Sequence, residues 1–229
     1  MISNVQGIDV DQWFIQRWTK FTSSEKHKLL SSGDYAGVFG PGAVTYIKTK
    51  ALEMSTVMHE RPELEEVKSL LWGKIHEFPA YEWYIKETKN YSMKFLGTET
   101  PLFITDDLMP TESGGSPDAL LLGTSKVDAG LEIKCPKTSM YHFDRLLWKD
   151  QWDLKENYLM CYTQIQDLLR ITEADVWHFL SFDDRQANPK KKGKIIEVFP
   201  DKKFQDNLVL RTQIAVKEKY KIFERHMNG

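Results

Sequence analysis

Two short apolar segments that carry charged residues stand at the centre of this sequence. They read PDALLL and GLEIKC and are joined by a polar segment rich in turn-forming residues. Alternation of side chains predicts two strands in a hairpin-like unit, Asp118–Leu122 and Gly130–Cys135. Asp118 begins the first strand, and Glu132 and Lys134 interrupt the second. Burying such groups unpaired is costly, so they must meet each other, water or a metal ion.

Helical patterns flank these strands on both sides. Thr22 and Glu25 have the spacing of a capping box, and Pro79 interrupts a long apolar periodicity at which a helix could kink or divide. The expected helices are 7–18, 22–33, 43–58, 63–89, 155–172 and 201–226, and the further expected strands are 91–97, 101–106, 174–183 and 194–200.

This order of elements predicts a single α/β domain over residues 1–229 with a central mixed β-sheet flanked by helices. Its parts are a mainly helical 1–90, a catalytic sheet core at 91–182, and a C-terminal strand and helix in 183–229. With 41% hydrophobic residues the chain can bury a full core. The formal net charge of -2 gives no global sign of a polyanion partner, so any basic surface must be local. The basic turn 190–194 is either a solvated turn or a phosphate contact.

Cysteine usage and the absence of targeting patterns point to the cytoplasm. Cys135 and Cys161 are the only cysteines and lie in apolar periodic segments, as reduced core thiols do. The N-terminal residues show no signal-peptide pattern, and no apolar run approaches the roughly 18 residues that a bilayer span needs. We therefore expect neither secretion nor a membrane partner.

Side chains two apart in a strand share a face, which places Glu132 and Lys134 together and turns Leu131 and Ile133 to the packed side. If the two strands pair, Asp118 can lie beside Glu132. Two carboxylates and an ammonium suit Mg²⁺, which takes oxygen ligands and activates a bound water. Lys134 would then orient or deprotonate that water, or stabilise the transition state. The alternative is a solvated hairpin with a surface ion pair worth little.

The pattern Pro-Asp, spacer, Glu-x-Lys resembles the PD-(D/E)XK nuclease superfamily and its restriction-endonuclease-like core. A wider resemblance, to the phage lambda exonuclease and YqaJ-like viral recombinase family, covers most of residues 7–180. The stretches that carry it are GIDV, RWTKFTSSE, LLWGKIHE, SPDALL, LEIKCPKTS and YTQIQ.

The resemblance implies a Mg²⁺-dependent exonuclease with one or two ions per active site, in which Mn²⁺ is expected to substitute. Members digest one strand of linear double-stranded DNA from its 5′ end and leave 3′ tails for a single-strand annealing protein. A homotrimeric ring and a phage or prophage origin in a bacterial host follow from the same resemblance. The alternatives are an endonuclease or junction resolvase on this core, or a catalytically silent DNA-binding module.

By the same resemblance, Asp118 and Glu132 look like direct metal ligands, with the carbonyl of Ile133 as a further one. Glu77 looks like the helix-borne acid that completes the metal site and reaches it through the metal or a water, and Gln164 looks like a helix residue that faces the site. Lys134 belongs to the same catalytic set. Glu77 could instead pair with Lys74 on its own helix. Gln164 could be a satisfied core amide.

Arg17, Ser24 and Ser116 resemble the pocket of the family for a DNA 5′-phosphate. A guanidinium and hydroxyls beside a helix N-terminus suit a phosphate, and Ser24 is expected at such a start. Arg17 could instead be a solvated helix end. Trp13 is expected to pack in the core. For Trp148 and Trp152, in a segment expected to be a loop, stacking on DNA and simple packing both stay open.

Overall fold

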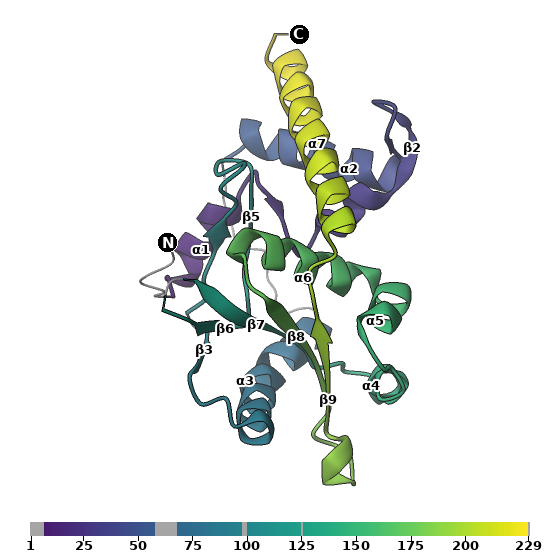
Figure 1. Ribbon diagram of the computed structural model, residues 1–229. Coiled ribbons are helices and arrows are strands. Elements are labelled where there is room, and N and C mark those ends of the chain that lie inside the picture. Colours follow the sequence, from purple (N-terminus) through teal and green to yellow (C-terminus); the bar gives the residue numbers. More distant parts are fainter. Residues whose placement is uncertain (1–6, 58–67, 98–99, 125, 229) are drawn as a thin grey trace.

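The computed structural model describes residues 7–57, 68–97, 100–124 and 126–228. A five-stranded mixed sheet of order β3-β6-β7-β8-β9 forms its centre (Figure 1). Its strands are β3 (Met93–Phe95), β6 (Ala119–Leu122), β7 (Val127–Lys134), β8 (Val176–Phe182) and β9 (Gly193–Val198). Only β7 and β8 run parallel, and the other neighbours are antiparallel.

A second, three-stranded sheet of order β1-β5-β4 lies at the end of the central sheet where β6 begins. Its strands are β1 (Phe21–Thr22), β4 (Ile104–Thr105) and β5 (Ser113–Gly115). Because β5 runs into β6 through Ser116 and Asp118, this small sheet connects the N-terminal segment to the acidic residues of the central sheet.

Helices cover both faces of the central sheet and build a third layer beyond it. They are α1 (Val10–Arg17), the 3₁₀ helix η1 (Lys26–Leu30), α2 (Pro41–Ser55), α3 (Lys68–Thr88), α4 (Ser139–Arg145), α5 (Gln151–Asn157), α6 (Leu159–Thr172), the 3₁₀ helix η3 (Pro189–Lys191) and α7 (Lys202–Asn228). The short strand β2 (Ser32–Tyr35) lies between η1 and α2.

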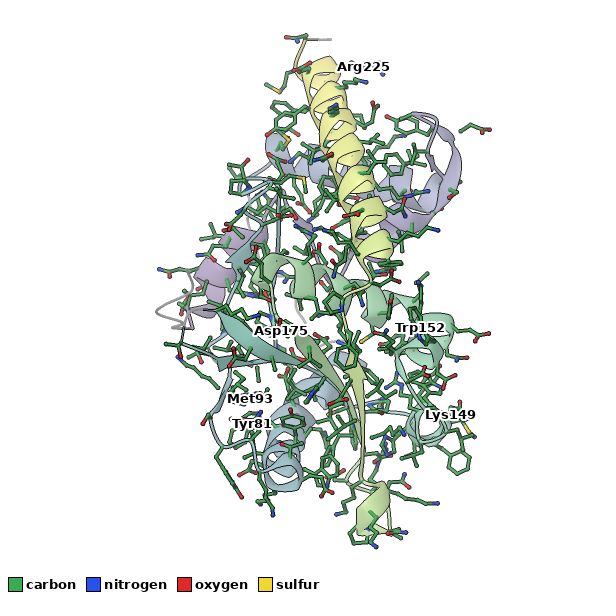
Figure 2. The ribbon with its side chains drawn as sticks, in the orientation of Figure 1. Tyr81, Met93, Lys149, Trp152, Asp175 and Arg225 are labelled. Atoms are coloured by element: carbon green, nitrogen blue, oxygen red, sulfur yellow. The ribbon has the colours of Figure 1, made fainter. Side chains whose placement is uncertain are left out.

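The two main core clusters lie on opposite faces of the sheet, as the positions of α3 and α6 in Figure 1 show. On one face Ala80 and Tyr84 of α3 pack with Leu131 and Leu180. Figure 2 shows Tyr81 of the same helix beside Met93, whose carbonyl accepts a hydrogen bond from the Tyr81 hydroxyl at 2.6 Å. The apolar face of α3 therefore fixes which way its polar side chains point.

On the other face α6 packs its apolar side against the sheet. Ile165 and Leu168 meet Trp177 and Phe179 there, all fully buried. A third cluster joins α2 and α7 to the N-terminal segment through Phe21 and neighbouring residues. In the described part of the chain, no helix has the length and apolar character that crossing a membrane would need.

The structure corrects several expected elements. The expected helix 22–33 is instead strand β1, the five-residue η1 and strand β2. Thr22 pairs with Gly114 in the small sheet, and Glu25 makes no side-chain capping bond. Thr22 is paired in the small sheet and Lys26 is buried. The capping-box spacing therefore does not begin a regular α-helix here.

Other corrections concern the middle of the chain. The expected helix 155–172 is divided at Tyr158 into α5 and α6. The segment expected to be a loop around Trp148 contains α4 and α5 on either side, and β5 was not expected. Pro79 lies inside a continuous α3, while the expected start of that helix at 63 falls outside the described residues.

Candidate active site

The pairing of β6 with β7 brings the two acids together. Ala119 pairs with Leu131 in antiparallel register, so Asp118 and Glu132 are the next opposed positions. The Asp118 carboxylate accepts a hydrogen bond from the backbone N–H of Ile133 at 2.6 Å. The backbone N–H of Ile133 is thus paired with a side-chain oxygen. This hydrogen bond holds the Asp118 carboxylate against β7.

Glu132 is fully buried and has a partner on each oxygen. Its Oε1 accepts from the Lys134 ammonium and its Oε2 accepts from the Gln164 amide at 2.8 Å. Gln164 comes from α6, so helix and sheet meet at this carboxylate. The expected shared face of Glu132 and Lys134 is seen here as a buried contact, in contrast to a solvated hairpin.

The pKa values show that the two acids are held at an energetic cost. Burial, and then the charge of Asp118, raise the pKa of Glu132 to about 8 against the pull of Lys134. Burial also raises the pKa of Asp118, although Lys134, the Ile133 N–H and a hydrogen bond with Glu77 act in the opposite direction. Two buried carboxylates whose pKa values are both raised favour sharing a proton or a cation.

Four of the five expected catalytic residues, all but Glu132, line one large pocket of about 1130 Å³. Lys134 and Gln164, which contact Glu132, are among these four. Glu77 reaches it from α3, where it contacts Asp118. Lys74 lines the same pocket, one turn before Glu77. Residues of 137–158 form a further wall of the pocket. Its cationic and aromatic side chains are Lys137, Tyr141, Arg145, Trp148 and Tyr158, and Asp144 and Asn157 also line it.

Arg17, Ser24 and Ser116 also come together. Arg17 donates to the hydroxyls of Ser116 and Ser24, each at 3.3 Å, and its guanidinium stacks over Trp13 at 4.2 Å. Burial lowers the pKa of Arg17, although the charges of Tyr46 and Glu25 act in the opposite direction. None of the ion pairs among the described residues joins Arg17 directly to a carboxylate. The cluster therefore offers a cation and two hydroxyls to an anion.

Two details of this cluster differ from expectation. Ser24 lies in a turn two residues before the 3₁₀ helix η1, so it does not begin an α-helix. Trp13 is more than core packing, because its indole N–H donates to the Ser116 hydroxyl at 2.7 Å. Gly115 allows the approach of the two segments, since a Cβ there would lie 2.2 Å from the Ser23 Oγ.

The site is compatible with a hard cation, although the described residues contain no group of three or more His, Cys, Asp and Glu side chains arranged for a metal. The oxygen donors are the carboxylates of Asp118 and Glu132 and the backbone of Ile133, which lines the pocket. A donor set this small leaves most positions to water and substrate, as Mg²⁺ prefers. The two raised pKa values give a reason for a cation here.

Apart from Trp148, the sequence did not single out the pocket-lining residues of 137–158. Arg145 and Tyr158 line the pocket, and Trp148 stacks on Phe179 with ring centroids 6.0 Å apart. Trp152 lies on α5 at the outer edge of the molecule, 54% exposed (Figure 2). The one available signal was the mixture of large apolar and basic residues in YHFDRLLW.

This chain is similar to several solved structures and to one protein family. An alkaline exonuclease of Laribacter hongkongensis superposes with a TM-score of 0.76 at 19% identity, over 96% of this chain and 97% of that one. The same enzyme in complex with dAMP gives 0.76 at 18%, again over 96% and 97%. A phage-related exonuclease of Haemophilus somnus 129PT gives 0.65 at 13%, over 90% of this chain and 96% of that one.

These similarities establish the fold, which is the PD-(D/E)XK nuclease fold that the sequence predicted. No curated protein matches the sequence. The model of the YqaJ-like viral recombinase domain matches residues 12–175, which include Asp118, Glu132, Lys134 and the cluster at Arg17. The chain therefore belongs to the family of YqaJ-like viral recombinase domains, as its motifs predicted.

Proposed function

We propose that this protein is a Mg²⁺-dependent nuclease that digests one strand of linear double-stranded DNA from its 5′ end. The observation that carries the proposal is that the Arg17 cluster and the acids are adjacent in the chain and border one pocket. Ser116, which Arg17 contacts, lies two residues before Asp118, and Ser24 lines the same pocket as Asp118. A terminal phosphate held by Arg17 would place the neighbouring phosphodiester at the acids.

The comparisons support this choice of chemistry. The two similar structures from Laribacter and Haemophilus are named exonucleases, and one of them is a complex with dAMP. A deoxynucleoside monophosphate is the product expected when an exonuclease releases mononucleotides. We therefore propose mononucleotides as the product of this chain and 3′ single-stranded tails as the remaining DNA.

The residues of the site have separable tasks in this proposal. Asp118, Glu132 and the Ile133 carbonyl would hold the cation, which supplies an activated water and neutralises charge on the phosphate. Lys134 orients or deprotonates the water, or stabilises charge on the phosphate in the transition state. Glu77 positions Asp118, and Gln164 holds the Glu132 carboxylate in line.

Two partners belong to the proposal. A ring-shaped homotrimer threaded by DNA would retain the substrate by topology, which suits a chain whose formal net charge is only -2. A single-strand annealing protein would receive the 3′ tail. Light scattering tests the first partner, because a stable species with the mass of one chain contradicts the ring.

The deciding experiment is digestion of an end-labelled linear duplex with and without Mg²⁺, beside a closed circular plasmid. We expect Mg²⁺-dependent release of nucleotides from 5′ ends and intact circles. Cleavage of circles would indicate an endonuclease or junction resolvase on this core. Binding without cleavage in Mg²⁺ or Mn²⁺ would indicate a silent DNA-binding module.

A further inference from the structure

Arg145 is a buried cation that forms no ion pair with any described residue. Its side chain is 8% exposed, and its hydrogen-bond partner is the Ser181 hydroxyl, at the long distance of 3.5 Å. The described residues provide no carboxylate that pairs with it. Arg170, by contrast, is tied to Asp106 by two hydrogen bonds of 3.0 and 2.6 Å. A buried charge that stays unpaired is strongly destabilising, so Arg145 requires an explanation.

Aromatic rings lie around the guanidinium, and a histidine orients the hydroxyl that the guanidinium contacts. It lies 4.7 Å from the ring centroid of Tyr158, 5.8 Å from Phe179 and 5.9 Å from Trp148. His142, also buried, contacts the Lys191 carbonyl at 2.8 Å and the Ser181 hydroxyl at 2.9 Å. Because a carbonyl only accepts, Nε2 of His142 donates to it and Nδ1 accepts from Ser181. The hydroxyl proton is thereby directed away from Arg145.

The orientation of α4 follows from this polar pair and opposes the hydrophobic effect. His142 and Arg145 face inward, while Met140, Tyr141, Phe143 and Leu147 are 57–71% exposed. A helix positioned only by apolar burial would turn the other way. The fold therefore maintains the inward placement of Arg145 at the expense of four large exposed side chains.

Arg145 shares its pocket with the acids. It lines the cavity that contains Asp118, Lys134 and Gln164. Its charge acts on the pKa of the Cys161 thiol, as do the charges of Lys134, Glu132 and Asp118, so the four groups lie within electrostatic reach of one residue of α6. A planar guanidinium that is already fixed and desolvated binds a phosphate through two parallel hydrogen bonds with little further ordering.

We propose that Arg145 binds a backbone phosphate of the DNA strand that enters this pocket, as a second phosphate contact separate from the one at Arg17. The inference rests on the proposed function, because it names the substrate as a phosphodiester chain. Arg145 then selects how deeply the strand is seated, and Tyr158 and Trp148 keep the guanidinium from following the departing phosphate.

The test is a scan with synthetic duplexes that each carry one uncharged methylphosphonate, at successive positions from the 5′ end. Binding is measured by fluorescence anisotropy without divalent metal, at one salt concentration. With wild type we expect one internal position at which neutralisation weakens binding about ten-fold to a hundred-fold. Arg145→Gln should lose this dependence and keep the dependence at the terminal phosphate.

Controls separate contact from structure. Arg211 donates to the carbonyl of Leu29 at 2.7 Å and does not line this pocket, so Arg211→Lys should give the wild-type profile. Arg145→Lys keeps the charge but loses the planar fork, and its dependence should fall below that of wild type. This second variant carries the scan if Arg145→Gln does not fold.

The same profile in wild type and in either Arg145 variant would overturn the contact. The proposed function fails separately, if wild type does not digest linear duplex in Mg²⁺. Loss of affinity in Arg145→Gln that is equal at every methylphosphonate position would assign Arg145 a purely structural role and would also overturn the inference.

Discussion

Two buried groups of charges contact α6, one through Gln164 and the other through Asp167 and Arg170, and they balance their charges differently. One is the site at Asp118, Glu132 and Lys134. The other, the α6 ion network, consists of Lys26, Asp106, Asp167 and Arg170. Lys26 donates to Asp167 at 2.7 Å, and Arg170 binds both acids. Two acids pair with two cations there, whereas in the site Lys134 is the one cation that forms a described ion pair with either Asp118 or Glu132.

The pKa directions reflect this difference in balance. Burial raises the pKa of Asp106, but Arg170 outweighs it and the net pKa lies below the ordinary value. In the site, burial prevails and the pKa of Glu132 rises to about 8. In the α6 ion network each acid is paired with a cation, so the network stabilises the fold. The site retains an excess of negative charge that favours a cation. Identical substitutions should therefore have opposite effects in the two groups.

The largest effect is expected from Glu132→Gln. Loss of a ligand charge should lower the rate of duplex cleavage in Mg²⁺ by at least about a thousand-fold, since the cation contributes several kcal/mol to the transition state. The free energy of unfolding without metal should stay the same or increase, because an unfavourable buried charge is removed. Single-turnover digestion and urea unfolding measure the two quantities. Near-normal cleavage would end the assignment of Glu132 as a ligand.

Lys134→Ala should separate metal binding from chemistry. An ammonium does not coordinate a cation, so Mg²⁺ affinity should be largely kept or improved, while the chemical step falls by about 10²- to 10⁴-fold. Calorimetric titration with Mg²⁺ beside single-turnover rates provides the comparison. Equal losses in affinity and rate would make Lys134 a structural partner of Glu132.

Asp106→Asn should break the α6 ion network. The substitution leaves Arg170 buried with an incomplete set of partners, and we expect a loss of about 3–5 kcal/mol in the free energy of unfolding. Asp206→Asn is the matched control, because Asp206 forms an exposed pair with Lys202 and should change stability by less than about 1 kcal/mol. A loss at Asp106 no larger than at Asp206 would refute the distinction between the two groups.

Arg17→Ala tests the connection between the groups. Ser23 donates to Asp167 of the α6 ion network at 2.6 Å, and its neighbour Ser24 contacts Arg17. Wild type should prefer 5′-phosphorylated over 5′-hydroxyl duplex ends, and Arg17→Ala should lose about ten-fold to a hundred-fold of that preference. Initial rates on both ends at one salt concentration decide it. An unchanged preference would mean that the phosphate is bound elsewhere.

The contrast also explains which parts the sequence could predict. Glu132 and Lys134 lie in β7, and Asp118 directly precedes the neighbouring strand β6, so local alternation was enough to place them together. Resemblance to a family added Glu77 and the cluster at Arg17. The α6 ion network joins Lys26, Asp106 and Asp167 across up to 141 positions and has no local pattern. The burial of Arg145 likewise has no local sequence pattern. On a helix with several apolar residues, an arginine is expected on the solvent side, but α4 turns Arg145 inward and its apolar residues outward.

The smallest expected effect is in the acid stability of the α6 ion network. Asp106 has a folded pKa below its ordinary value of 3.8, held there by Arg170 although burial raises it. A lowered pKa stabilises the fold above the unfolded value, and this contribution is lost as pH falls through the folded pKa. Wild type should therefore lose stability below about pH 4. Asp106→Asn has no such proton to gain, so its free energy of unfolding, although smaller at pH 7, should fall less steeply between pH 5 and pH 3. Urea unfolding of both proteins across this range measures the two slopes. Parallel slopes would show that other carboxylates govern the acid limb and that Asp106 is not held ionised by Arg170.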